Sequence, residues 1–295
     1  MTVTRHATAH EFWEQTRGLF SADPIRHTGP ITVLNQLVGQ ALTGQAAAQD
    51  DMLFLTAHRG SELVGAVLQT PPHPLAISGL PVEVHDELIN HLLANDIRLP
   101  GVRGPRDVAE LFIQRWTVAT GAAVSRIVPE RLYRLEALAV PAREGHARIA
   151  TTEDLPLVGR WCDEFADEVT GEPTEDATSR SANGIEVASA AMANGRPSVI
   201  WVDGDDSAFA MVTAPLHGMS RIGPVYTPHG KRRRGYGSAV TAAAARWALD
   251  QGARDVLLFA DLDNPTANSI YQKIGFRPVL DAVDAEFAER NTLDP

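Results

Sequence analysis

Two distant segments of the chain share one layout, and this restricts the folds open to it. Residues 52–69 (MLFLTAHRGSELVGAVLQ) and 197–215 (PSVIWVDGDDSAFAMVTAP) each place a glycine turn between two runs rich in β-branched and apolar residues. Such a pattern predicts a β-hairpin. The turn glycines Gly60 and Gly204 are 144 residues apart, and in both copies a proline follows eleven residues later.

After each hairpin the same order of elements is predicted: strand, helix, strand, helix and strand. The helices, which have apolar residues near helical period, are expected at residues 82–96 and 106–121 in the first half and at 238–252 and 265–275 in the second. Strands mixed with helices indicate an α/β or α+β class. A diverged internal duplication explains the agreement; a chance similarity of two βα patterns is the alternative.

Length and interruptions divide the chain into two predicted domains. A chain of 295 residues exceeds the usual roughly 100–200 residues per domain. Pro141 and Gly145 interrupt regular structure between the two repeats. We therefore expect domains at 1–140 and 141–295.

Composition excludes several classes of protein. With 44% apolar and 21% charged residues the chain is typical of soluble globular proteins, and its net charge of −11 argues against binding DNA or RNA. Cys162 is the only cysteine, and there is no zinc-ligand spacing, signal peptide or membrane-length apolar run. We expect a cytoplasmic protein without a metal, acting as a monomer or homodimer, with neither nucleic acid nor membrane as partner.

Against this acidic background the run KRRRGYGSA, residues 231–239, is a local anomaly. It follows a strand-like segment that contains Gly223 and Pro224, and it leads into a predicted helix. A helix start with unpaired N–H groups, approached through glycines, is an anion site. A Walker A loop would need Gly-Lys-Ser/Thr, and the dinucleotide motif would need glycine in place of Val240, so neither ATP nor NAD is favoured.

Two motifs in the second half resemble the GNAT acetyltransferase superfamily. The first is Arg232-x-x-Gly235-x-Gly237, similar to the turn that holds the phosphates of coenzyme A. The second lies within residues 255–276 and resembles the pattern N-x-x-A-x-x-L/I-Y-x-K-x-G-F, with Asn264, Ala267, Ile270, Tyr271, Lys273, Gly275 and Phe276. The resemblance implies two GNAT-like domains, each a mixed, mostly antiparallel sheet flanked by helices, with a splayed central strand pair in the second.

The resemblance also implies which residues bind acetyl-CoA. Backbone groups of the strand would hold the pantetheine arm, the basic turn would hold the phosphates, and Asn264, a helix N-cap by position, would add a contact to the arm. The full expected set is Val225, Tyr226, Thr227, Arg232, Arg233, Arg234, Gly235, Tyr236, Gly237, Ser238 and Asn264. Many members carry glycine where this chain has Arg233. Residues 77–88 (ISGLPVEVHDEL), at the matching place in the first half, have no arginine and no paired glycines, so that half is expected to lack the cofactor.

Acetyl transfer needs a proton for the departing thiolate and an acceptor for the proton of the amine. The motif assigns the first role to Tyr271, whose phenol is protonated at neutral pH. For the general base, His217 and Glu168 are the candidates, and a chain of waters is the competitor. Cys162 lies on the apolar face of its predicted helix and is expected to pack rather than react.

The segment around Glu168 is predicted to be an amphipathic helix whose acidic residues Asp163, Glu164 and Asp167 are expected to be solvated. Residues 170–184 are predicted to form a polar loop in the acceptor-binding region, where Glu172, Glu175 and Asp176 would attract a cationic amine.

The predicted function is an acetyl-CoA-dependent N-acetyltransferase that acts on a primary amine of a small molecule or peptide by direct attack in a ternary complex. The alternative is a non-catalytic acyl-CoA-binding or interaction protein of the same fold. The sequence does not identify the acceptor.

Overall fold

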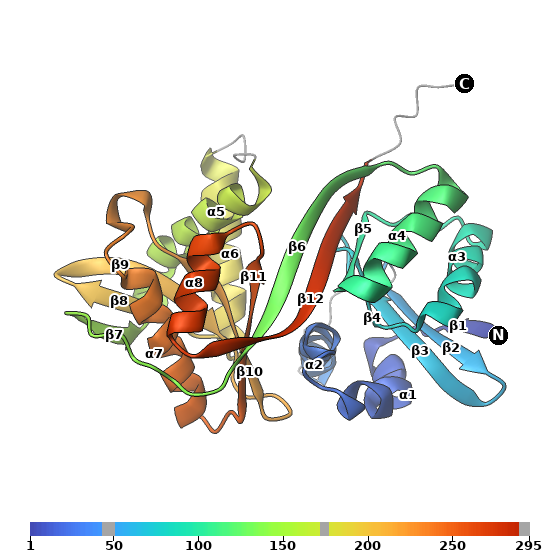
Figure 1. Ribbon diagram of the computed structural model, residues 1–295, viewed down its shortest axis with the longest axis horizontal. Coiled ribbons are helices and arrows are strands. Elements are labelled where there is room, and N and C mark those ends of the chain that lie inside the picture. Colours follow the sequence, from blue (N-terminus) through green and yellow to red (C-terminus); the bar gives the residue numbers. More distant parts are fainter. Residues whose placement is uncertain (43–50, 172–176, 289–295) are drawn as a thin grey trace. The chain divides into compact units, whose positions relative to one another are not determined.

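The computed structural model describes residues 1–42, 51–171 and 177–288 (Figure 1). Within these ranges the chain forms two compact units, here called unit 1 and unit 2. Unit 1 contains residues 1–131, 261–263 and the segment from 280 onward, and unit 2 contains residues 132–260 and 264–279. The chain therefore passes from one unit to the other within two long strands, β6 (Val124–Leu135) and β12 (Phe276–Phe287), and residues 261–263 also belong to unit 1.

In unit 1 the expected hairpin is β2 and β3, and the expected helices are α3 and α4. The elements are β1 (Thr2–Arg5), α1 (Ala9–Ala22), α2 (Thr28–Leu42), β2 (Leu53–Arg59), β3 (Glu62–Gln69), β4 (Leu75–Gly79), α3 (His85–Ala94), β5 (Gly101–Pro105) and α4 (Arg106–Thr120). The sheet order is β1-β2-β3-β4-β5-β12, in which β4 and β5 are parallel and the other neighbours antiparallel. The end of β12 pairs with β5 from Ala282 opposite Pro105 to Glu286 opposite Gly101.

Unit 2 repeats this plan. Its elements are β7 (His146–Ile149), α5 (Leu155–Thr170), α6 (Ala177–Ala193), β8 (Ser198–Asp203), β9 (Asp205–Val212), β10 (Met219–Tyr226), α7 (Tyr236–Asp250), β11 (Asp255–Asp261) and α8 (Pro265–Lys273). The order β7-β8-β9-β10-β11 is antiparallel except for β10 and β11, which are parallel. The predicted hairpins, helices and mixed sheet class are therefore confirmed.

Alternation along β9 gives the sheet of unit 2 its two apolar faces. Ala208, Ala210 and Val212 belong to the cluster that includes α7, whereas Phe209 and Met211 belong to the cluster with α5 and α6. Because successive side chains of a strand point to opposite faces, one strand serves both cores. The small residues lie under α7, so this alanine-rich helix can approach the sheet closely.

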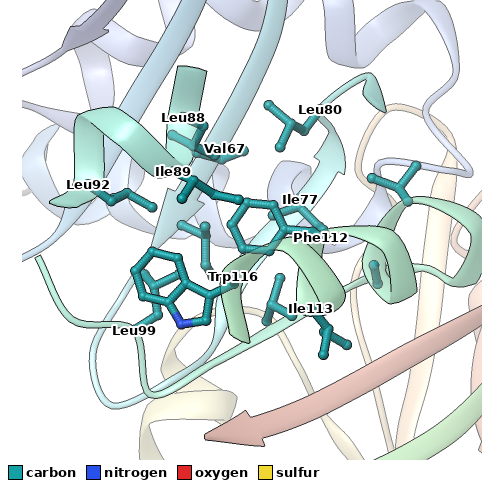
Figure 2. Close-up of a cluster of buried hydrophobic side chains, with 14 of the residues drawn as sticks. Val67, Ile77, Leu80, Leu88, Ile89, Leu92, Leu99, Phe112, Ile113 and Trp116 are labelled. Carbon is teal, nitrogen blue, oxygen red and sulfur yellow. The ribbon is translucent and has the colours of Figure 1, made fainter. Parts of the chain in front are cut away.

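Unit 1 has an apolar core between its sheet and helices α3 and α4. Figure 2 shows Phe112 and Trp116 of α4 packed against apolar side chains of α3 and of the strands. The two rings are stacked, with centroids 6.2 Å apart. Val283, Ala285 and Phe287 of β12 belong to the same cluster. Strand β12 thus completes the core of unit 1, whose other members come from residues 53–116.

The prediction of a polar loop over 170–184 is wrong from residue 177 onward, where α6 begins. This helix packs against α5 through two glycines. A Cβ added to Gly184 would lie 2.2 Å from the carbonyl oxygen of Gly159, and one added to Gly159 would lie 2.7 Å from the Ile185 nitrogen. Sequence periodicity missed the helix because its contact surface is made of small residues rather than a large apolar stripe.

We predict that unit 1 loses stability in mild acid through a buried histidine. His27 is 6% exposed beside Phe20 and has Nδ1 3.0 Å from Ser78 Oγ, and burial lowers its pKa from 6.5 to about 4. The unfolded chain therefore binds more protons between pH 6.5 and 4, and stability falls as the pH falls through that window. At pH 5 the loss from His27 is about 2 kcal/mol.

Urea unfolding at pH 7.5 and pH 5 tests this expectation. His27→Gln cannot be protonated and should reduce the loss of stability between the two pH values, while His10→Gln, on the exposed face of α1, is the matched control. Equal pH dependence in His27→Gln and the wild type would contradict the assignment. His85, fully buried and with its pKa also lowered to about 4 by burial, accounts for a remaining slope.

Candidate active site

A change of register in β10 opens the sheet of unit 2. β10 pairs in parallel with β11 from Met219 to Ile222, opposite Asp255 to Leu258, and among the described residues the two strands pair no further. On its other side β10 stays paired with β9, but the register shifts between Ile222 and Val225. The two parallel strands therefore part beyond Ile222, as the splayed pair expected from the sequence requires.

The same shift changes the face to which the end of β10 belongs. Ile222 lies opposite Val212 on the α7 side of the sheet, whereas Tyr226 lies opposite Phe209 on the α5 side. Residues four apart in a regular strand would share one face. The bulge thus directs Tyr226 toward α5 while leaving Val225 against the α7 cluster.

An open cleft of about 400 Å³ lies where Tyr226 meets α5. Its lining residues are Glu164, Asp167, Glu168, Tyr226, Pro228 and His229. Burial and a hydrogen bond with Glu164 raise the pKa of Tyr226, so its phenol is neutral at physiological pH. Nε2 of His229 lies 3.0 Å from Glu168 Oε1. With three carboxylates in one cleft, the site favours a cationic ligand.

The basic turn leads directly into α7. Arg233 and Gly235 both have a left-handed backbone, with φ of 62° and 81°, and the helix starts at Tyr236. Gly235 is the N-cap and no side chain caps this helix; the first intrahelical bond runs from the Ala239 nitrogen to the Gly235 oxygen. The N–H groups of the first turn therefore remain as donors for an anion.

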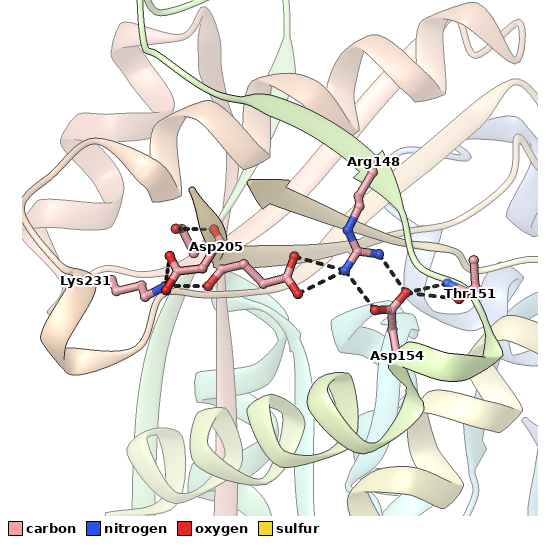
Figure 3. Close-up of polar contacts among 7 residues, drawn as sticks. Arg148, Thr151, Asp154, Asp205 and Lys231 are labelled. Atoms are coloured by element: carbon pink, nitrogen blue, oxygen red, sulfur yellow. Dashed lines mark hydrogen bonds and ion pairs between the residues drawn. The ribbon is translucent and has the colours of Figure 1, made fainter. Parts of the chain in front are cut away.

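The four cations of the turn do not act together. Figure 3 shows Lys231 pointing toward Asp205. Lys231 Nζ lies 2.5 Å from Asp205 Oδ1 and 2.6 Å from the backbone oxygen of Asp206. Arg232 donates through Nε to the Thr227 oxygen at 2.8 Å and forms an ion pair with Glu168. Arg233 and Arg234 are exposed beside the start of α7.

A second polar cluster fixes the hairpin to which Lys231 binds. Arg148 of β7 contacts both Asp154, just before α5, and Asp206, at 2.7 and 2.9 Å (Figure 3). The hydrogen bond from Arg148 lowers the pKa of Asp154 to about 2. The β8–β9 turn is thus held from β7 and from the basic turn.

Arg143 is a neighbour of the basic turn that sequence reasoning missed. Its guanidinium carbon lies 5.0 Å from the ring centroid of Tyr236, and its Nη2 lies 3.4 Å from Asp203 Oδ2, which also accepts from the Tyr236 hydroxyl at 2.8 Å. A Cβ on Gly235 would lie 3.8 Å from Arg143 Cδ. The buried phenol of Tyr236 is thereby engaged inside the protein, which leaves only its backbone N–H for a cofactor.

Helix α8 carries the second motif. Asn264 is its N-cap, with Oδ1 accepting from the Ala267 nitrogen at 3.0 Å. Tyr271 lies edge-on to Tyr133 and Phe276, with ring centroids 6.4 and 6.3 Å away. Burial raises the pKa of Tyr271 to about 12, and its hydroxyl has no hydrogen-bond partner in the part of the chain that the structure describes.

The two candidate bases occupy different places. Glu168 lines the cleft, as does the side chain of Tyr226. His217 is exposed in the turn before β10, at the end of this strand remote from Tyr226, roughly 25 Å away along an extended strand. The structure thus brings only Glu168 to the cleft. Glu172, Glu175 and Asp176 lie outside the described residues, and Cys162 is buried with its pKa raised by burial to about 12.

The acidic residues of α5 are the main part of the site that the sequence did not predict as such. For Glu164 and Asp167 the sequence predicted only solvation, and the structure adds that both line the open cleft. Their spacing of three residues predicts that both lie on one face of the helix. That Tyr226 lies opposite this face depends on the bulge in β10. Of the residues described, no group of three or more His, Cys, Asp or Glu could hold a metal ion, and no helix has the length and apolarity to span a membrane.

Known proteins with a similar fold were found by comparison of sequence and structure. A family model described as FR47-like protein matches residues 200–283. No curated protein matches the sequence. Among solved structures, an acetyltransferase of the GNAT family from Colwellia psychrerythraea is similar with a TM-score of 0.59 and 14% identity, covering 98% of this chain and 100% of the other.

Two further structures extend the likeness. A tandem GNAT protein from the clavulanic acid biosynthesis pathway has a TM-score of 0.55 and 16% identity and covers 99% of both chains. A GCN5-related N-acetyltransferase from Sphaerobacter thermophilus has a TM-score of 0.53 and 15% identity and covers 85% of this chain and 90% of the other. The fold is that of the GNAT acetyltransferases, present twice in one chain. The resemblance found in the sequence and the predicted fold class are confirmed.

We predict that Arg233→Gly stabilises the protein. A left-handed backbone is unfavourable for a residue with a Cβ, and Arg233 has φ of 62°. Allowing for the greater freedom of glycine in the unfolded chain, the free energy of unfolding should rise by about 0.5–1 kcal/mol. Arg234→Gly is the control, since Arg234 has no positive φ and should lose stability. Denaturant unfolding that ranks Arg233→Gly below wild type would contradict the strain.

Proposed function

We propose that the protein is an acetyl-CoA-dependent N-acetyltransferase whose acceptor is a primary amine of a small molecule or peptide, attacked directly in a ternary complex. The observation that carries the proposal is the parting of β10 from β11 immediately before a helix that starts through a glycine turn without a side-chain cap. An open strand supplies backbone groups for an extended amide-bearing arm. The bare helix start supplies donors for phosphates.

The residues present fit this cofactor. Val225 and Tyr226 at the end of β10, with Thr227 after it, would hold the pantetheine arm. The side-chain oxygen of Asn264 caps α8, so its amide nitrogen would donate to the same arm. The first-turn N–H groups of α7, from Tyr236 to Ser238, together with Arg232, Arg233 and Arg234, would hold the phosphates. Gly237 suits this place because a Cβ there would lie 3.4 Å from Thr227 Oγ1.

We propose one working site per chain, in the domain of residues 141–295, while residues 1–140 form a degenerate domain. Helix α3 of unit 1, the counterpart of α7, has Asp86 and Glu87 in its first turn, whereas the first turn of α7 has no acidic residue. Carboxylates at a helix N-terminus neutralise its attraction for phosphate. The hydroxyl of Ser78, near the end of β4, is already hydrogen-bonded to Nδ1 of His27.

Acetyl-CoA would supply an activated acetyl group on a thioester. The acidic cleft would bind the acceptor as an ammonium ion, since an alkyl amine has a pKa near 10.4. Glu168, or a water beside it, would take the proton that makes the amine nucleophilic. Tyr271, kept protonated by burial, would donate a proton to the sulfur as the C–S bond breaks, so the thiol leaves neutral.

We predict that Tyr271→Phe lowers kcat for thiol release by about a hundredfold, because a general acid contributes roughly 10²–10⁴ to rate. The assay is thiol release from acetyl-CoA during a screen of diamines, aminoglycosides, amino acids and peptides. Tyr133→Phe is the control: it removes a hydroxyl from the adjacent ring, which donates to Asn268 Oδ1 at 2.7 Å, and should reduce stability more than kcat.

An unchanged kcat in Tyr271→Phe would remove the tyrosine from the proton transfer. A wild-type protein that binds coenzyme A in calorimetry but releases no thiol with any amine would favour the non-catalytic binder instead.

We predict that Asp167→Asn raises the KM for a dicationic acceptor such as 1,4-diaminobutane by about three- to tenfold, because it removes one carboxylate from the cleft. The KM for acetyl-CoA should change much less, and the effect should shrink as salt rises. Glu153→Gln, near the start of α5 and outside the cleft-lining set, is the charge-matched control. An identical KM shift in both variants would exclude the cleft as the acceptor site.

A further inference from the structure

Arg232, the arginine of the phosphate turn, is engaged by the protein itself. Its Nε donates to the Thr227 oxygen at 2.8 Å, its Nη2 pairs with Glu168, and its guanidinium lies 5.6 Å from the ring centroid of Tyr226. Both side chains of the ion pair are 36% exposed. The cation that the motif assigns to phosphate is thus turned toward α5.

Glu168, on the other side of this pair, belongs to the acceptor cleft. It lines the cleft with Asp167 and Tyr226 and also lies 3.0 Å from His229 Nε2. One carboxylate therefore serves two places: it neutralises the arginine of the proposed phosphate site, and it is part of the acidic surface proposed to receive the amine. The two sites share a single ion pair.

We propose that the Arg232–Glu168 ion pair couples the cofactor site to the acceptor cleft, an inference that rests on the proposed function. A phosphate at the start of α7 competes with Glu168 for Arg232, and an ammonium ion in the cleft competes with Arg232 for Glu168. Each ligand alone must disrupt the same pair. Once either has done so the other meets a released partner, so coenzyme A and amine each strengthen the binding of the other.

The strength of the pair sets the size of the coupling. A partly exposed ion pair is worth a modest free energy, so its disruption should weaken each ligand alone by about three- to fivefold. Removing the carboxylate while keeping the side-chain shape, in Glu168→Gln, should therefore tighten coenzyme A by this factor. Loss of any negative charge near a phosphate site tightens binding to some degree, and Asp167→Asn measures that background.

The experiment is calorimetric titration with coenzyme A, which has no acetyl group to transfer, so that binding is measured without turnover. Glu168→Gln should bind coenzyme A about three- to fivefold more tightly than wild type and more tightly than Asp167→Asn. In the Arg232→Ala background the extra gain of Glu168→Gln over Asp167→Asn should vanish, because the pair is already absent. Saturating 1,4-diaminobutane should tighten coenzyme A in the wild type and leave Glu168→Gln unchanged.

Three results would overturn the coupling: equal affinities for Glu168→Gln and Asp167→Asn, a Glu168→Gln gain that persists without Arg232, or a wild-type affinity indifferent to the diamine. Thermal unfolding of each variant verifies that it is folded. Failure of the proposed function looks different, because wild-type protein would then either give no heat with coenzyme A or bind it and release no thiol from acetyl-CoA with any amine.

Discussion

The register shift between Ile222 and Val225 is the constraint on which the rest of unit 2 depends. It separates β10 from β11 on one side while β9 still holds the strand on the other. It also turns Tyr226 to the face of the sheet covered by α5, which creates the acidic cleft. The anion site proposed at α7 and the cation site proposed at α5 thus meet at the end of one strand.

The two units show how few differences separate the proposed phosphate site of unit 2 from the matching helix start of unit 1. Both have a parallel strand pair whose ladder is short, followed by a helix without a side-chain cap. In unit 2 the helix is reached through Gly235 and exposed arginines. In unit 1 it is reached through Val82–Val84, and carboxylates occupy its first turn. Local charge, rather than the fold, distinguishes the two helix starts.

Much of this could be predicted from the sequence, because hairpins, capped helices and glycine turns are local features. Helix α6 escaped because it packs through Gly184 rather than an apolar stripe, and Arg143 escaped because nothing in its own segment indicates that it lies over Tyr236. The pairing of Arg232 with Glu168 joins residues 64 positions apart and depends on the direction of Tyr226. Contacts of this kind depend on the bulge in β10. The sequence predicts where the bulge lies, but not the direction in which it turns the following side chains.

The crossing of the chain within β6 and β12 has a consequence for biosynthesis. The sheet of unit 1 is completed by residues 282–286, which are translated long after β5. Until they emerge, β5 lacks this neighbour, and Trp116 lacks Phe287, whose ring lies 6.3 Å away in the finished core. Unit 1 therefore stays incomplete while unit 2 is synthesised, so a growing chain carries an open strand edge until β12 emerges.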